Sequence, residues 1–132
     1  MPKFGKRSFE KLETCHPSIQ EVMIEAIKSG PDFTIICGHR NESDQNNAYY
    51  NGNTQLLFPR SKHNKMPSMA IDIAPYPIDW DKIPSFIYLA GYVMGVADRL
   101  GIKLRWGGDW NQNYDQSDER FRDFPHFELV KG

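Results

Sequence analysis

Apolar side chains recur at helical spacing in two long segments of the chain. In residues 17–30 they follow the i, i+3, i+4, i+7 pattern of an amphipathic helix, and Gly30 favours an end there. Residues 85–101, SFIYLAGYVMGVADRLG, are apolar on most of their circumference, which predicts a well-buried helix capped by Ser85 and stopped by Gly101. The more polar NESDQNNAYYNG predicts a short helix with Ser43 as its N-cap and Gly52 as its stop.

Four short runs predict β-strands. They are FTIICGHR (33–40), MAIDIA (69–74), KLRWGGDW (103–110) and HFELV (126–130), and Pro75 and Pro77 end the second. The polar stretch 111–125 separates the last two. No repeat or long linker divides residues 1–132, so we expect one domain. The order of elements predicts an α+β fold in which helices pack on a small, mostly antiparallel sheet.

Composition and charge narrow the function classes. The chain has 132 residues, of which 39% are hydrophobic and 25% charged, as in soluble globular proteins. Its net charge of −1 provides no general attraction to nucleic acid. Residues 83–97 form the longest weakly charged stretch, which is shorter than the ~20 residues of a membrane span. The N-terminal residues lack the apolar run of a secretory signal. We therefore expect cytoplasmic synthesis, no nucleic-acid partner and no membrane insertion.

Three side chains at or near predicted strand borders have the chemistry of a metal site. His63 precedes the second strand, Asp72 lies within it, and His126 opens the last strand. Two imidazoles and one carboxylate form a recurring catalytic zinc set that leaves a position for water. An aspartate in an apolar strand is costly to bury without a partner. Pairing with an arginine, or capping of a loop, is therefore the alternative for Asp72.

A general base is available beside this set. Asp123 lies three residues before His126 in DFPH, so one tight turn brings its carboxylate next to the metal. Pro125 favours such a turn.

Three motifs together resemble a known family. SKHNKMPSMAIDI, WGGDW and DFPHFEL, in this order, are similar to the zinc D-alanyl-D-alanine carboxypeptidases and L-alanyl-D-glutamate endopeptidases. This family includes VanY-like enzymes and phage endolysins and shares its zinc scaffold with the hedgehog domain. The resemblance implies a zinc peptidase acting on peptidoglycan stem peptides, with an L-alanyl-D-glutamate endopeptidase favoured. A D-alanyl-D-alanine carboxypeptidase and a non-catalytic zinc-bearing binding module are the alternatives.

The same resemblance implies roles for individual residues. His63, Asp72 and His126 match the zinc ligands, and Asp123 matches the catalytic base. Arg40 matches an arginine that binds a substrate carbonyl or carboxylate and stabilises the oxyanion. An ordinary salt bridge is the alternative for Arg40.

Further matches concern the walls of the expected cleft. Ser61 matches a serine that hydrogen-bonds substrate or holds its loop. Trp106 begins a WGGD stretch expected at the floor of the cleft, where it would contact substrate. Asp109 either orients a ligand histidine or stabilises a turn. Gln45 matches a glutamine for which a packing or anchoring role is favoured.

Two departures from the family pattern affect this site. Eight residues separate His63 from Asp72, where the usual spacing is six, and we expect the two additional residues to bulge outward near Pro67. His39 stands where many relatives have tyrosine. This difference is expected to alter the substrate pocket and leave the zinc chemistry intact, with a role for His39 as a competing metal ligand as the less favoured alternative.

The resemblance also bears on regulation and release. Some relatives bind regulatory calcium (Ca2+) in an acidic loop, here Asp115, Asp118 and Glu119, but EF-hand spacing is missing and a solvated loop is favoured. We expect a monomer that is made in the host cytoplasm and reaches the cell wall through a holin.

Overall fold

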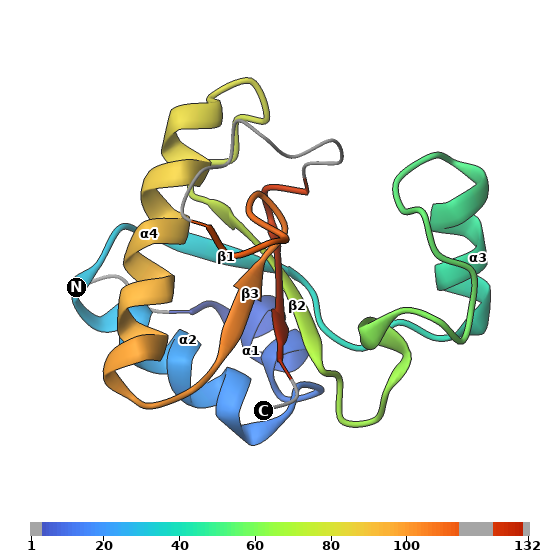
Figure 1. Ribbon diagram of the computed structural model, residues 1–132, viewed down its shortest axis with the longest axis horizontal. Coiled ribbons are helices and arrows are strands. Elements are labelled where there is room, and N and C mark those ends of the chain that lie inside the picture. Colours follow the sequence, from blue (N-terminus) through green and yellow to red (C-terminus); the bar gives the residue numbers. More distant parts are fainter. Residues whose placement is uncertain (1–3, 114–122, 131–132) are drawn as a thin grey trace.

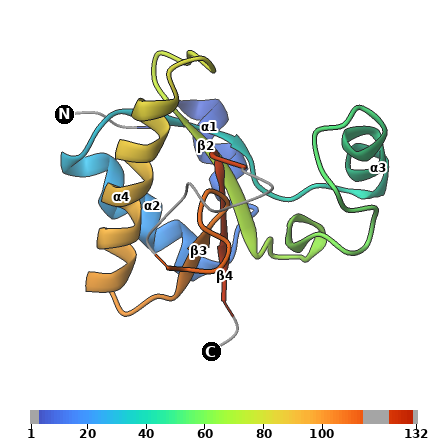
Figure 2. The same ribbon diagram turned by 45° about the horizontal axis from the view of Figure 1, so that its top comes forward.

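Four antiparallel strands form the central sheet of this computed structural model, which describes residues 4–113 and 123–130 (Figure 1). Their order across the sheet is β1-β2-β4-β3. The strands are β1 (Phe33–Cys37), β2 (Ala70–Pro75), β3 (Leu104–Trp106) and β4 (His126–Leu129). β4 therefore pairs with both β2 and β3, although it comes last in the sequence (Figure 2). The expected α+β fold with an antiparallel sheet is confirmed.

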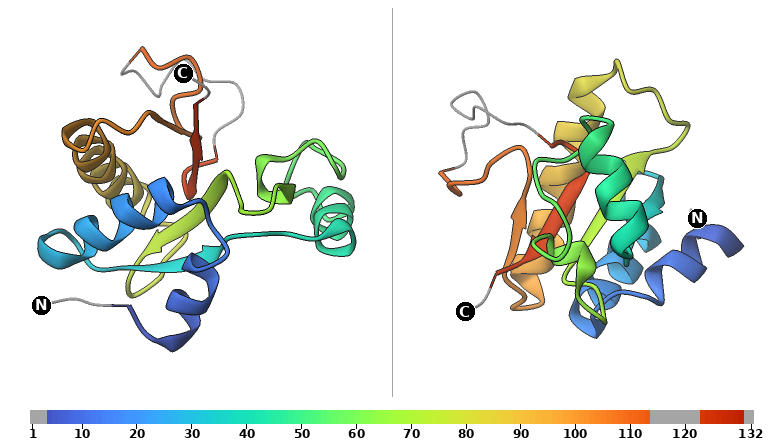
Figure 3. Two further views of the ribbon diagram at one scale, coloured as in Figure 1. Left: turned by 90° about the horizontal axis from the view of Figure 1, so that it is seen from below. Right: turned by 90° about the vertical axis from the view of Figure 1, so that its right-hand side faces the viewer.

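Helices surround this sheet unevenly. They are α1 (Lys6–Leu12), α2 (Pro17–Ser29), α3 (Glu42–Tyr50) and α4 (Ile83–Arg99). α1 packs along β1, α2 packs on α4, and α4 contacts β2 and β3. α3 lies apart from the other three helices, on the opposite side of the sheet (Figures 1 and 3). In the described part of the chain, none of the helices is long and apolar enough to span a membrane.

Helix starts differ from those predicted. α3 is capped by Asn41, whose side chain accepts a hydrogen bond from the amide of Asp44, so Ser43 is not the N-cap. α4 begins at Ile83, and the hydroxyl of Ser85 donates to the carbonyl of Lys82 within its first turn. Because that hydroxyl donates to a carbonyl and accepts from no helix amide, the expected cap at Ser85 is wrong. The seven-residue α1 was not predicted, since it buries only Ser8 and Leu12 and offers no clear apolar stripe.

Two predicted strands are shorter than expected. β1 ends at Cys37, next to a register shift, and β3 ends at Trp106. A glycine follows each of these ends in close contact with another segment. A Cβ at Gly38 would lie 2.4 Å from the carbonyl oxygen of Lys11, and one at Gly107 would lie 2.2 Å from that of Asp123. The chain leaves the sheet at these points to pack closely against α1 and the turn before β4.

The core and the functional face meet on β2. Ile71 and Ile73 are fully buried among the apolar side chains of α2, α4 and β4. Successive side chains on a strand point to opposite faces, so Asp72 faces away from this core. Across the sheet Asp72 is paired with Cys37 of β1 and with His126 of β4. The fold thus brings these three side chains to one face.

Glycine substitutions test this packing. We expect Gly38→Ala to lower the free energy of unfolding by about 1–3 kcal/mol, because the added methyl group overlaps backbone atoms of α1. Gly95→Ala is the matched control, since that helical glycine has open space around it. It should raise the free energy of unfolding by about 0.5–1 kcal/mol. Urea unfolding followed by circular dichroism measures both; equal stability of the two variants would contradict the close contact.

Candidate active site

His63, Asp72 and His126 converge on one point. The first lies in a short 3-10 helix, η1 (Lys62–Asn64), and the other two are partners across β2 and β4. Oδ1 of Asp72 lies 3.2 Å from Nε2 of His63 and 3.1 Å from Nδ1 of His126. The two imidazole nitrogens are 3.3 Å apart. Three donor atoms therefore face one another at distances that a single metal ion could bridge with a small adjustment of the side chains.

In each imidazole, the ring nitrogen that does not face Asp72 contacts another group of the protein. Nδ1 of His63 lies 2.7 Å from the carbonyl oxygen of Gly38. Since a carbonyl only accepts, Nδ1 carries a proton. In the neutral ring the lone pair is therefore on Nε2, the nitrogen that faces Asp72. Nε2 of His126 lies 2.8 Å from Oε1 of Glu128, which fixes this ring in the same way. Outer partners of this kind orient metal-binding histidines.

The loop that carries His63 is itself well held. The hydroxyl of Ser61 accepts a hydrogen bond from the amide of His63, and the amide of Ser61 donates to the side chain of Asn64. Ser61 is buried and also borders the site cavity. These contacts support a loop-holding role for Ser61. Lys65, Met66 and Pro67 are exposed, so the additional residues of the spacer lie on the surface as expected.

Burial and charge act in opposite directions on these groups. Burial alone would raise the pKa of Asp72, but the two imidazoles hold that pKa well below its usual range. Burial alone would lower the pKa of His63, whereas the Asp72 carboxylate raises it. The pKa of His126 is raised as well, against burial, by its hydrogen bonds to Asp72 and Glu128. A cation that binds here must displace these protons, so binding strengthens as the pH rises.

Asp123 lies beside the cluster, as the sequence predicted. It begins a turn in which the amide of His126 donates to its carbonyl oxygen. Carboxylate and ring atoms of Asp72, Asp123 and His126 lie within 4.8 Å of one another. Burial, and then the charge of Asp72, raises the pKa of Asp123 to about 6. A carboxylate in this range can both take up and release a proton near neutral pH.

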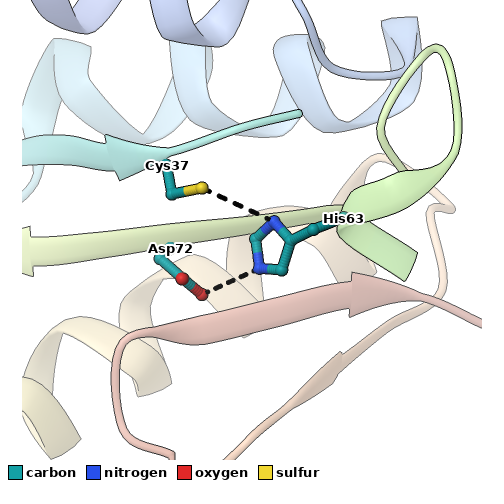
Figure 4. A group of neighbouring side chains, drawn as sticks. All are labelled: Cys37, His63 and Asp72. Atoms are coloured by element: carbon teal, nitrogen blue, oxygen red, sulfur yellow. Dashed lines mark hydrogen bonds and ion pairs between the residues drawn. The ribbon is translucent and has the colours of Figure 1, made fainter. Parts of the chain in front are cut away.

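A second group of possible ligands includes a residue that the sequence analysis did not select. Cys37, His63 and Asp72 also lie within 4.8 Å of one another. Figure 4 shows that Cys37 and Asp72 face different nitrogens of the imidazole. The sulfur lies 4.0 Å from Nδ1, the nitrogen already bonded to Gly38. The set of His63, Asp72 and His126 therefore fits a metal better, because it uses lone pairs that backbone contacts leave available.

Arg40 connects the site to α3. Its guanidinium lies 3.4 Å from Oδ2 of Asp72 and donates to Oε1 of Gln45 at 3.0 Å. The arginine partner that we considered for Asp72 thus exists, but it uses the oxygen that does not face the imidazoles. Gln45 is fully buried and donates to the carbonyl of Leu56 at 2.6 Å. This glutamine anchors α3 and the following loop to the site.

A cavity of about 930 Å³ opens onto the cluster. Its lining includes His63, Asp72, Asp123 and His126, together with Arg40 and Ser61. It also includes Trp80, Trp110 and Glu128, which the sequence analysis missed. Glu128 could have been found, since it lies two residues after His126 on a strand and thus on the same face. Trp110 closes the WGGDW motif, to which the sequence analysis gave a role only at Trp106 and Asp109, and nothing in the local pattern around Trp80 indicated its position.

Two predicted site residues lie elsewhere. Trp106 belongs to the buried core, and its indole donates to the carbonyl of Phe124. A carboxylate oxygen of Asp109 accepts from the amide of Asn113, as in a turn. Both border a different hollow of about 470 Å³, next to α4. The expected substrate contact of Trp106 is therefore not supported, and the carboxylate found behind His126 belongs to Glu128.

Two other expectations concern different parts of the chain. His39 donates its amide to the hydroxyl of Thr14 and belongs to neither ligand group found among the described residues. The acidic residues considered for calcium, Asp115, Asp118 and Glu119, lie outside the described residues, and that expectation stays a prediction.

Comparisons with known proteins agree with the motifs. A family model described as phage L-alanyl-D-glutamate peptidase matches residues 1–130. The L-alanyl-D-glutamate peptidase of Escherichia phage T5 is 39% identical over 135 residues, which cover 97% of this chain and 98% of the relative. The crystal structure of the Serratia marcescens L-Ala D-Glu endopeptidase ChiX matches with a TM-score of 0.76 and 27% identity, over 97% of this chain and 90% of that one. The resemblance stated from the sequence is confirmed.

Glu128 offers a test of the cluster as a metal site. The Glu128→Gln variant keeps a hydrogen-bond acceptor near His126 but removes a negative charge. Glu128 carries this charge because His126 and Arg105 lower its pKa despite burial. We expect affinity for zinc to fall by about tenfold, within the usual range for such partners. Isothermal titration calorimetry measures this, with the exposed Glu21→Gln of α2 as control. Equal zinc affinities in the two variants would contradict the role of Glu128.

Proposed function

Because the chain belongs to the phage L-alanyl-D-glutamate peptidase family, we propose that it is a zinc peptidase that hydrolyses the bond between L-Ala and D-Glu in peptidoglycan stem peptides. One observation carries the proposal. His63, Asp72 and His126 meet at donor distances of 3.1–3.3 Å, and Asp123 lies beside them in the same cavity.

The three side chains suit a single zinc ion. His63 would offer Nε2, His126 Nδ1 and Asp72 Oδ1, a set of nitrogen and oxygen donors that zinc accepts. A bound zinc ion supplies a Lewis acid for the scissile carbonyl and lowers the pKa of a water molecule to about 7. The contacts of Gly38 and Glu128 hold the two imidazoles in the orientation that this binding requires.

Asp123 moves the proton during the reaction. Its carboxylate takes a proton from the attacking water and passes it to the nitrogen of the departing D-Glu residue as the peptide bond breaks. A pKa of about 6, which burial and Asp72 produce, keeps both protonation states accessible near neutral pH. Its place in the turn before β4 brings it close to His126.

Arg40 stabilises the negative charge that develops on the carbonyl oxygen. Its guanidinium stays charged and presents several donors in fixed directions, which suits this role. Gln45 and Asp72 each hold one end of the guanidinium, so that its position is set before substrate binds.

The rival functions have less support. A D-alanyl-D-alanine carboxypeptidase would use similar motifs, but the family and both relatives are named for the other bond. A non-catalytic zinc-bearing module has no need for the carboxylate of Asp123 beside the ligands.

We also propose that residues 1–132 act as a single peptidase domain and as a monomer. The protein would reach the wall from the host cytoplasm through a holin lesion, as expected of a phage enzyme.

The bond that is cut can be identified directly. We expect digestion of purified peptidoglycan to release peptides with a new amino group on D-Glu, leaving L-Ala on the glycan strand. Mass spectrometry of the fragments measures this. Release of terminal D-Ala instead would support the carboxypeptidase.

The zinc requirement is tested separately. A chelator should abolish the digestion, and zinc should restore it. Activity in a fully zinc-depleted sample would contradict the zinc proposal.

Asp123→Asn tests the proposed base. This variant keeps the size of the side chain but cannot take up the proton, so we expect kcat to fall by about 10²–10⁴-fold. The zinc content should stay near one ion per chain, as measured by elemental analysis. Asp98→Asn, an exposed change on α4, is the control and should retain full activity. Unchanged hydrolysis by Asp123→Asn would refute the assigned mechanism.

A further inference from the structure

Trp80 is an exposed aromatic residue at the edge of the active-site cavity. It is 54% exposed and lies in the segment between β2 and α4. The same cavity is lined by Trp80 and by His63, Asp72 and His126. Because Trp80 is exposed and also borders this cavity, its indole offers a ligand in the cavity both an apolar face and an N–H donor.

The ring of Trp80 is held in place from one side. It stacks on the buried Phe86 of α4, with ring centroids 5.4 Å apart and an angle of 21° between the planes. One face of the indole is therefore packed, while more than half of the side chain remains exposed. The result is a flat apolar platform that needs little ordering when a ligand binds, which favours affinity.

Uncharged polar groups line another part of this cavity. Asn53, Thr54 and Gln55, from the loop after α3, contribute amides and a hydroxyl group. This loop and the segment between β2 and α4 lie apart in the ribbon (Figure 1), and residues of both line the cavity. A pyranose ring has an apolar C–H face that packs on an aromatic ring and a rim of hydroxyl groups that bind amides. The combination of platform and amides thus fits a sugar.

The proposed substrate carries a sugar close to the bond that is cut. In peptidoglycan, L-Ala is attached to the lactyl group of N-acetylmuramic acid, so one residue separates the sugar from the scissile bond. A bond placed at the triad of His63, Asp72 and His126 brings that sugar into or near the same cavity. The volume of about 930 Å³ lies at the upper end of the range for ligand cavities.

We propose that Trp80 forms a subsite for the N-acetylmuramic acid that carries the stem peptide. The inference rests on the proposed function and extends it: the enzyme recognises a glycopeptide and not only a peptide. Stacking on the indole orients the sugar, and the L-Ala carbonyl then reaches Arg40 and Asp123.

Two matched substrates test this subsite. One is an N-acetylmuramoyl stem peptide, and the other is the same peptide with an N-acetyl group in place of the muramoyl group. We expect Trp80→Ala to lower kcat/KM on the muramoyl substrate by roughly 3- to 10-fold, as for loss of an aromatic stacking contact, and to leave the acetyl substrate within about twofold. Trp80→Phe should retain most of the activity on both. Tyr88→Ala, which removes an exposed ring of α4 outside the cavity lining, is the control.

Equal losses on both substrates, or no loss on either, would overturn the proposal. Binding to the wild-type protein gives a second reading that does not depend on the stability of a variant. N-acetylmuramoyl-L-alanine should shift the NMR signal of the Trp80 indole N–H, whereas N-acetyl-L-alanine should not; no shift with the sugar compound would refute the subsite. If the wild type cleaves the L-Ala–D-Glu bond in neither substrate, the proposed function fails, and this outcome is distinct from cleavage of both without an effect of Trp80.

Discussion

The carboxylate of Asp72 is the contact on which the site depends. It projects from a strand between two fully buried isoleucines, and its side chain is only 14% exposed, so it needs partners to offset the cost of lost hydration. It has three. One oxygen faces His63 and His126, and the other faces Arg40. Because these residues come from η1, from β4 and from the segment between β1 and α3, this single group ties three separate parts of the chain together.

A second polar residue ties α3 to that site. Gln45 is the buried residue of α3, and its amide contacts Arg40, Asn64 and the carbonyl of Leu56. α3 has little apolar surface to bury, so directional hydrogen bonds and not a hydrophobic face hold it to the body of the protein. The wall of the cavity and the position of Arg40 are therefore set by the same amide. The anchoring role favoured for Gln45 agrees with these contacts.

The sequence predicted those parts of the structure that depend on local periodicity. The apolar patterns predicted α2 and α4. Places at or near strand borders selected His63, Asp72 and His126, and the three-residue distance to His126 selected Asp123. Contacts made across the fold were missed. The direction in which Trp106 points depends on the turn after β3. The proximity of Cys37 to His63 depends on strand register. Strand ends and helix caps were misplaced because close approaches of glycines and competition between neighbouring polar residues decide them.

The order of the strands has a consequence for the assembly of the protein. β4 is the last strand in the sequence, yet it lies inside the sheet between β2 and β3. It brings His126, and with it Asp123 and Glu128, to a face on which the earlier segments have already placed His63 and Asp72. Until that strand inserts, a chain emerging from the ribosome has neither a finished sheet nor the full set of proposed metal donors. Such non-local pairing is slow compared with helix formation. Completion of the sheet and completion of the proposed site are thus one event.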